Sequence, residues 1–308
     1  MSNTKPILEV KNLKQYFKVS RKFTVKAVDG ISFKVMPGQT YGLVGESGSG
    51  KSTTGRSIIR LYKPTDGEVI FNGENVSGNL SKKELSLLRT KMQMIFQDPM
   101  ACLNPRKKVL DIIAEGLDIH NDYANVEERN NKVYKILELV GLSKEHATRY
   151  PHQFSGGQRQ RIGIARALIM KPDLIIADEA ISALDVSIQA QVVNLMKKIQ
   201  KKTNTAFLFI AHDLSMVKYI SDHIGVLHYG NLVETGTTEE IFSNPIHPYT
   251  KSLLSAIPIP NPHLEKSRKS LSYDYGESGI DYAKGTQKLV GGEHYVLATD
   301  EEFEAWTK

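Results

Sequence analysis

One eight-residue segment constrains the fold of this chain more than any other. Residues 45–52 read Gly-Glu-Ser-Gly-Ser-Gly-Lys-Ser, a complete G-x-x-x-x-G-K-[ST] pattern. An apolar run at residues 41–44 precedes it and an amphipathic stretch at residues 57–62 follows it, so we expect a strand, a loop and a helix in succession. Glycines let consecutive backbone N–H groups turn toward phosphate oxygens, and the helix start adds partial positive charge. The segment therefore predicts a site for nucleotide phosphates.

The predicted cofactors of this loop are ATP and Mg²⁺. Lys51 should reach the β- and γ-phosphates as a point charge, and the Ser52 hydroxyl should ligate Mg²⁺. The residues expected to contact the nucleotide are Gly45, Glu46, Ser47, Gly48, Ser49, Gly50, Lys51, Ser52 and Thr53.

Polar side chains follow two further apolar runs, and we expect them at the same edge of the sheet. Asp178 and Glu179 follow residues 174–177, and His212 follows residues 207–210. In a doubly wound sheet ligands bind at the carboxyl ends of the strands. We therefore predict that Asp178 holds Mg²⁺ through water, that Glu179 is the general base and that His212 contacts the γ-phosphate. The alternative for each side chain alone is a helix cap or a structural role.

The apolar runs also predict the fold class. They alternate with helical stretches, which is the βαβ rhythm of an α/β fold, here a P-loop NTPase core with a mostly parallel sheet. An N-terminal antiparallel β subdomain is predicted from residues 7–10, 33–35 and 67–71, the last before an Asn72-Gly73 turn.

An α-helical subdomain is expected as an insertion at about residues 98–158, where apolar residues recur at helical spacing before Gly141. We predict a nucleotide-binding domain over residues 1–260 and a C-terminal extension over residues 261–308. Residues 267–292 are rich in Gly, Ser and Tyr, and their composition is typical of a loosely ordered surface tail.

A second element with exposed N–H groups begins at Ser155. It reads Ser155, Gly156, Gly157 and Gln158, and it opens a predicted helix whose N-terminus attracts phosphate. One nucleotide cannot easily use both elements of a single chain. We therefore expect a head-to-tail pair, in which this element of one subunit covers ATP that is held by the loop of the other.

The motifs, taken in order over roughly the first 260 residues, resemble those of ABC transporter ATPases. Phe154 stands where that family usually has the Leu of LSGGQ, and Ala180 stands where a proline usually follows the catalytic glutamate. The resemblance implies that Gln97 senses Mg²⁺ and water, that Asp185 belongs to a segment acting across the dimer, and that Phe17 stacks on adenine. Tyr16 and Phe23 remain candidates for the stacking role.

Three longer segments are similar to the ATPases of oligopeptide and dipeptide importers, and most similar to the F-type ATPases of oligopeptide permeases. They are residues 97–106, 185–192 and 244–254. The resemblance implies a subunit at the cytoplasmic face of the cell membrane, with a paralogous ATPase as heterodimer partner, two transmembrane permease subunits and an extracellular or periplasmic substrate-binding protein. No motif contacts a substrate, so nickel, glutathione and other small solutes remain open.

Composition narrows the alternatives. The longest apolar runs are strand-sized, whereas a spanning helix needs roughly 20 apolar residues, so the chain is not expected to cross a membrane. A polar N-terminus argues against export, and the single Cys102 argues against a cysteine-ligated cluster. The formal net charge of +6 suits a non-transport ABC ATPase that acts on nucleic acid or ribosomes. We expect no nucleic-acid partner, because basic and acidic residues are mixed along the chain and neither tandem ATPase cassettes nor a long coiled coil appears.

Overall fold

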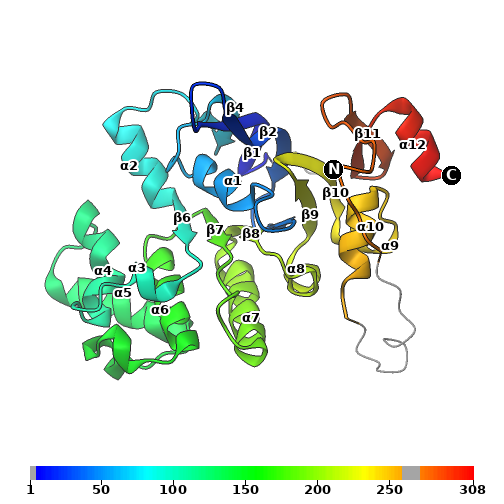
Figure 1. The fold of residues 1–308 in the computed structure, drawn as a ribbon. Helices are drawn as coiled ribbons and strands as arrows, with labels where there is room; N and C mark the ends of the chain where they lie inside the picture. The colour runs from blue at the N-terminus through cyan, green and yellow to red at the C-terminus, as the bar shows by residue number, and fades with distance from the viewer. Residues whose placement is uncertain (1–4, 259–270) are drawn as a thin grey trace.

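The computed structural model describes residues 5–258 and 271–308 of the chain. Its strands form two sheets, a small antiparallel one and a larger one in which parallel pairs predominate (Figure 1). The predicted α/β architecture, with an N-terminal antiparallel subdomain and a helical insertion, is confirmed.

The small sheet has the strand order β2-β1-β4-β5. Leu8, Val10 and Leu13 of β1 are buried, and they lie in one of the two hydrophobic clusters of the described residues. Asn72 and Gly73 both have positive φ values, 52° and 84°, as the predicted two-residue hairpin turn requires. The strands of this sheet are β1 Leu8–Lys18, β2 Thr24–Val35, β4 Asp66–Phe71 and β5 Glu74–Asn75.

The large sheet has the order β11-β12-β10-β9-β3-β8-β7-β6. The expected strands at residues 41–44, 174–177 and 207–210 are confirmed as β3, β7 and β8, and every residue of these three strands is buried. The strands are β3 Thr40–Val44, β6 Met92–Ile95, β7 Leu174–Asp178, β8 Ala206–Ile210, β9 His223–His228, β10 Asn231–Thr237, β11 Thr286–Gly291 and β12 His294–Ala298.

Four parallel strands end at nearly the same level. The register pairs Leu43 of β3 with Ile210 of β8, Asp178 of β7 with the same Ile210, and Ala177 with Ile95 of β6. The segments that leave these strands therefore emerge along one edge of the sheet, in the order β3, β8, β7, β6.

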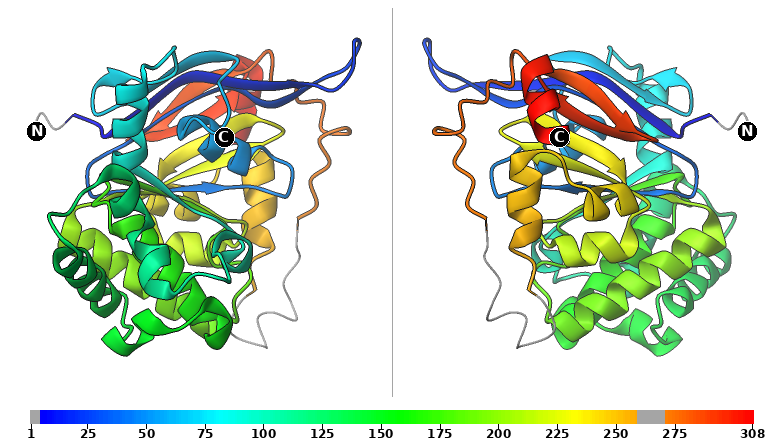
Figure 2. Two further views of the ribbon diagram at one scale, coloured as in Figure 1. Left: turned by 90° about the vertical axis from the view of Figure 1, so that its left-hand side faces the viewer. Right: turned by 90° about the vertical axis from the view of Figure 1, so that its right-hand side faces the viewer.

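Helices surround the large sheet, and α3 to α6 gather at the end of the molecule that lies opposite β11 and α12 (Figures 1 and 2). The helix predicted before Gly141 is α5, which ends at Leu139, and Gly141 takes a φ of 75° just after it. The division into domains stays a prediction. The predicted end of the helical insertion, at about residue 158, falls inside α6. The helices are α1 Lys51–Ile58, α2 Lys82–Lys91, α3 Pro99–Cys102, α4 Val109–His120, α5 Val126–Leu139, α6 Gly156–Leu168, α7 Val186–Thr203, α8 Leu214–Ile220, α9 Thr238–Ser243, α10 Pro248–Ser255 and α12 Asp300–Thr307, with 3₁₀ turns at Lys144–Thr148 and Pro151–Gln153.

The C-terminal segment corrects one expectation. Within residues 267–292, the part from 271 onward is not a loose tail, and residues 267–270 lie outside the described residues. β11 and β12 form an antiparallel hairpin, and β12 continues the large sheet by pairing Val296 with Glu234 of β10. Composition misled because the tyrosines that suggested a surface tail are partly or fully buried against the core, as with Tyr282.

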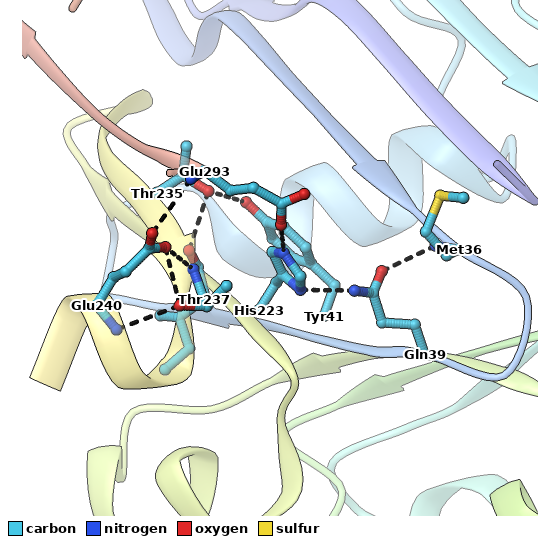
Figure 3. A network of polar contacts seen from close by, with 9 residues as sticks. Met36, Gln39, Tyr41, His223, Thr235, Thr237, Glu240 and Glu293 are labelled. Carbon is cyan, nitrogen blue, oxygen red and sulfur yellow. Dashed lines mark hydrogen bonds and ion pairs between the residues drawn. The ribbon is translucent and has the colours of Figure 1, made fainter. Parts of the chain in front are cut away.

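Side-chain contacts hold the turn of this hairpin on the core (Figure 3). The Glu293 carboxylate hydrogen-bonds His223, whose other ring nitrogen faces the Gln39 amide. The Glu293 backbone N–H donates to Glu240 of α9, at 3.1 Å. The C-terminal hairpin is thus attached to β9, to the start of β3 and to α9.

A buried aromatic cluster joins α10, the end of β9 and the C-terminal segment. His228 and His247 lie within it, 6% and 0% exposed, and burial lowers the pKa of His228 to about 4 and that of His247 to about 3. Their described ring neighbours are Tyr229, Tyr249, Tyr273, Tyr275, Tyr282 and Trp306.

The two histidines predict a loss of stability in mild acid. Between pH 6.5 and about 4 the unfolded chain binds protons at these histidines that the folded chain does not bind, so the free energy of unfolding falls as the pH falls through that window. Above pH 6.5 both states are neutral there and the effect is absent. We expect His228→Gln to flatten the dependence of the melting temperature on pH. His152→Gln, at an exposed histidine, should leave the slope of the parent protein, and equal slopes for both variants would contradict the assignment.

Candidate functional site

The loop after β3 has the backbone geometry of a phosphate cradle. Gly45, Gly48 and Gly50 have φ values of 149°, 82° and 106°, a region that favours glycine. A Cβ at Gly45 would lie 2.1 Å from the Leu227 carbonyl oxygen, and one at Gly50 would lie 2.2 Å from that of Ala27, so neither position can carry a side chain. The loop leads directly into α1, whose free N–H groups face it.

Lys51, the first residue of α1, turns back over the loop. It is 4% exposed, and its ammonium group donates to the carbonyl oxygens of Gly45 at 2.7 Å and Glu46 at 2.8 Å. Burial lowers the pKa of Lys51, while the nearby carboxylates of Glu179 and Asp178 act in the opposite direction. A cation held in this way lies beside the place where phosphate oxygens would enter the cradle.

Asp178 and Ser52 meet across the space between β7 and α1. The Ser52 hydroxyl donates to Asp178 Oδ1 at 2.6 Å, and Asp178 is 1% exposed. Arg56 contacts the other oxygen of this carboxylate at 3.3 Å. Ser52 and Arg56 are four residues apart on α1, so both side chains point to the same carboxylate.

This pair of oxygen donors suits Mg²⁺. The ion prefers oxygen ligands and usually takes only one or two from protein side chains, with water and phosphate oxygens completing its octahedron. Among the described residues no group of three or more His, Cys, Asp and Glu could hold a metal on its own. The residues present therefore fit an ion that enters together with a nucleotide.

Glu179 has a left-handed backbone conformation, with a φ of 48°. Positive φ costs energy for a residue with a side chain, and such residues gather at functional sites. The Glu179 N–H donates to the Ile210 carbonyl at 2.9 Å, and both the N–H and the hydroxyl of Ser182 donate to the Glu179 carbonyl. The turn is therefore fixed by hydrogen bonds, although Ala180 stands where related ATPases usually have proline.

Gln97 and His212 lie at the same sheet edge as the cradle. Gln97 follows β6 by two residues and His212 follows β8 by two residues, and both side chains are exposed. The strand register places them on either side of Asp178 and Glu179. The predicted edge cluster is therefore brought together from four strands, while the roles of Gln97 and His212 stay predictions.

The Ser155 element does not contact the cradle of its own chain in the described residues. Ser155 caps α6 and accepts from the Gln158 N–H at 3.3 Å, while the Gln158 side chain accepts from the Ser155 N–H. A Cβ at Gly157 would lie 2.4 Å from Ile188 of α7, which explains the glycine there. Asp185 is the N-cap residue of α7, is exposed and makes no side-chain capping bond.

The three aromatic candidates for adenine stacking differ in their surroundings. Phe17 is half-buried and makes an edge contact with Tyr62, with a centroid distance of 5.4 Å. The Tyr16 hydroxyl is engaged by Asp29, and Phe23 is 59% exposed. Phe17 stays the predicted residue.

Two residues of this site were not among the sequence predictions. Arg56 could have been found, since it lies one helical turn after Ser52. Tyr249 of α10 could not have been found from the sequence. Its hydroxyl accepts from the Glu46 N–H at 2.9 Å, and the two residues are 203 positions apart.

Comparison with known proteins decides the family. The profile described as "ABC transporter" matches residues 28–182, and the profile described as "Oligopeptide/dipeptide transporter, C-terminal region" matches residues 233–278. The oligopeptide transport ATP-binding protein OppF of Bacillus subtilis is 61% identical over 305 residues, covering 99% of this chain and 100% of that protein. The chain belongs to the ABC transporter family, among its ATP-hydrolysing subunits.

Other members of the ABC family agree in sequence and in fold. The dipeptide transport ATP-binding protein DppF of Lactococcus lactis is 53% identical and covers 100% of this chain and 99% of its own. The solved structure of the ATP-binding cassette MJ0796, a dimer in a post-hydrolysis state bound to ADP and Pi, aligns with a TM-score of 0.68 and 29% identity. The alignment covers 75% of this chain and 98% of that one. No helix in the described part of this ABC subunit is both long and apolar enough to span a bilayer.

Lys51→Ala should weaken nucleotide binding by about ten- to a hundredfold, because a charge-assisted contact to phosphate is lost. The check is the dissociation constant of MgADP, measured with the isolated subunit. Lys107→Ala is the matched control, since Lys107 is an exposed lysine paired with Glu115 far from the loop. Equal constants for the two variants would remove Lys51 from the phosphate site.

Proposed function

We propose that this chain is the ATP-hydrolysing subunit of an importer that takes up oligopeptides through separate membrane subunits. The observation that carries the proposal is the match of both profiles in sequence order, together with high identity to peptide-transport subunits over nearly the whole chain. No described residue is assigned to a peptide, so the substrate class rests on these relatives and on the C-terminal profile.

In this proposal the sheet edge carries out the chemistry. Lys51 and the loop amides bind the phosphates, and Ser52 and Asp178 hold Mg²⁺, which neutralises phosphate charge. We assign to Glu179 the role of accepting the proton of the attacking water, because it directly follows Asp178 at the sheet edge in a turn that hydrogen bonds fix. His212 and Gln97 flank it and orient the γ-phosphate and the water.

The catalytic unit we propose is a head-to-tail dimer with a paralogous ATPase. Ser155 and Gly156 at the start of α6 are exposed, and the capping bonds of Ser155 are made to Gln158 of its own helix, so we assign the task of covering the nucleotide to the Ser155 element of a partner subunit. The solved cassette MJ0796 is itself a dimer bound to ADP and Pi, which supports this arrangement. ATP then stabilises the closed dimer, and hydrolysis releases it.

We place the contact with the membrane subunits in a groove between the core and the helical insertion. The groove has a volume of about 470 Å³ and is lined by the turn that follows α1 and by residues of α2, β6, α4 and α6. Ile119 and Leu61 at its rim are 70% and 57% exposed, and Phe96 of its lining directly precedes Gln97. An apolar segment of a permease bound in this groove would contact Phe96, so a movement of Gln97 would shift that segment. In this position the subunit is peripheral, at the cytoplasmic face of the membrane.

Glu179→Gln should leave MgATP binding within about twofold of the parent and lower turnover by about 10² to 10⁴, because only the general base is removed. Turnover is measured by phosphate release from the purified transporter complex. Uptake of a labelled oligopeptide by cells that carry only the variant should fall in parallel. Glu304→Gln, at an exposed glutamate of α12, is the control. Near-normal hydrolysis by Glu179→Gln would exclude the assigned role.

Ser155→Arg should abolish ATP-dependent dimer formation while sparing MgADP binding by the isolated subunit. The measurement is molecular mass by light scattering, with the partner ATPase and in a Glu179→Gln background. Ser81→Arg is the matched control, because Ser81 forms the same kind of capping box with Glu84 at the start of α2. Loss of a cap costs about 1 kcal/mol in either variant. A normal dimer with Ser155→Arg would contradict the head-to-tail geometry.

A further inference from the structure

The hydroxyl of Tyr249 is bonded to the backbone of the phosphate loop. Tyr249 lies on α10, within the region matched by the C-terminal transporter profile, and it is 1% exposed. The Glu46 N–H donates to its oxygen at 2.9 Å. A residue outside the phosphate loop and the other predicted ATPase motifs thus contacts the second residue of the cradle.

This contact and the Lys51 contact act on the same peptide group. The carbonyl oxygen of Gly45 and the N–H of Glu46 belong to one planar unit. Lys51 binds the carbonyl end at 2.7 Å, and Tyr249 binds the N–H end at 2.9 Å. The orientation of this peptide is therefore fixed from both sides, next to a glycine that has no Cβ to restrict its backbone.

Tyr249 is itself held by groups from three other segments. Its ring stacks on His228, with centroids 4.0 Å apart, and His228 Nδ1 lies 2.6 Å from the Tyr282 hydroxyl of the C-terminal segment. The fully buried Glu234 of β10 accepts the N–H groups of residues 246 and 247, which fixes the start of α10. His294 of β12 lies against the same carboxylate at 2.7 Å.

A second contact from the same region supports the loop. The Gly230 N–H, two residues after His228, donates to the Ser49 carbonyl at 2.9 Å. The loop is therefore hydrogen-bonded at two points: α10 contacts it near its beginning, at Glu46, and the turn after β9 contacts it near its end, at Ser49.

We propose that Tyr249 is a positioning residue for the phosphate loop: by holding the peptide between Gly45 and Glu46, it keeps the amides that follow in the loop directed toward the nucleotide phosphates. The inference rests on the proposed nucleotide site and deepens it. Tyr249 does not touch the nucleotide. It lowers the cost of binding, because a loop that is already ordered loses less freedom when the phosphates enter. Through Tyr282 and His294, the C-terminal segment takes part in the same support.

The test is Tyr249→Phe in the full-length subunit, which removes one oxygen atom and keeps the ring stacked on His228. The dissociation constants of MgADP and MgATP should both rise about three- to tenfold, the range expected for one lost hydrogen bond. In the transporter complex the KM for ATP should rise by a similar factor, and kcat should stay within twofold. Amide hydrogen exchange should speed up in the segment that contains Glu46.

Tyr41→Phe is the matched control, since the Tyr41 hydroxyl is equally buried but bonds Thr235 at 2.8 Å. It should lower the melting temperature comparably and leave nucleotide affinity unchanged. If Tyr249→Phe binds MgADP as tightly as the parent while Lys51→Ala does not, the positioning role is overturned and the nucleotide site stands. If Lys51→Ala is also unchanged, the site itself fails. If Tyr41→Phe and Tyr249→Phe weaken MgADP binding equally, the loss of affinity follows from lower protein stability, and the positioning role is overturned.

Discussion

The parallel register of four buried strands is the constraint on which the rest of the structure depends. β3, β8, β7 and β6 are apolar throughout or nearly so, which commits both of their faces to the core. Because their carboxyl ends are level, short polar segments that lie far apart in the sequence converge at one edge. A slip of one residue in any of these strands would carry its polar group away from the others, so packing of the core and assembly of the site are the same requirement.

The parts of this arrangement that sequence could predict are those encoded locally. A strand, a glycine-rich loop and a helix follow one another around Lys51, and the strand that ends in Asp178 can be read from its apolar run. Contacts between residues that lie far apart in the sequence are harder to predict. Arg56 was within reach, because it shares a helix face with Ser52, whereas the bond from Glu46 to Tyr249 spans 203 positions and leaves no pattern along the chain. The C-terminal hairpin was missed because the Gly, Ser and Tyr content of residues 267–292 favours a loose tail, while the hairpin is stabilised by pairing with β10.

Glu179 has a strained backbone conformation that hydrogen bonds stabilise. Its left-handed backbone conformation ends the extended course of β7 directly after Asp178. Asp178 is buried against Ser52, while Glu179 is half-buried. Ala180, where the family resemblance of the sequence implies proline, is buried, and the two hydrogen bonds from Ser182 hold the turn through backbone and hydroxyl contacts.

The phosphate loop is supported by contacts from later parts of the chain. If the cradle were supported by its own strand and helix alone, the cost of ordering it would fall on nucleotide binding. In this chain a tyrosine and the end of β9 already hold the loop from outside, and both are packed on a segment that extends to the last described helix. A displacement of α10 would break the bond from Tyr249 to the Gly45–Glu46 peptide. The C-terminal segment therefore supports the loop indirectly, through the contact of Tyr282 with His228, on which the Tyr249 ring stacks, and of His294 with Glu234, which fixes the start of α10.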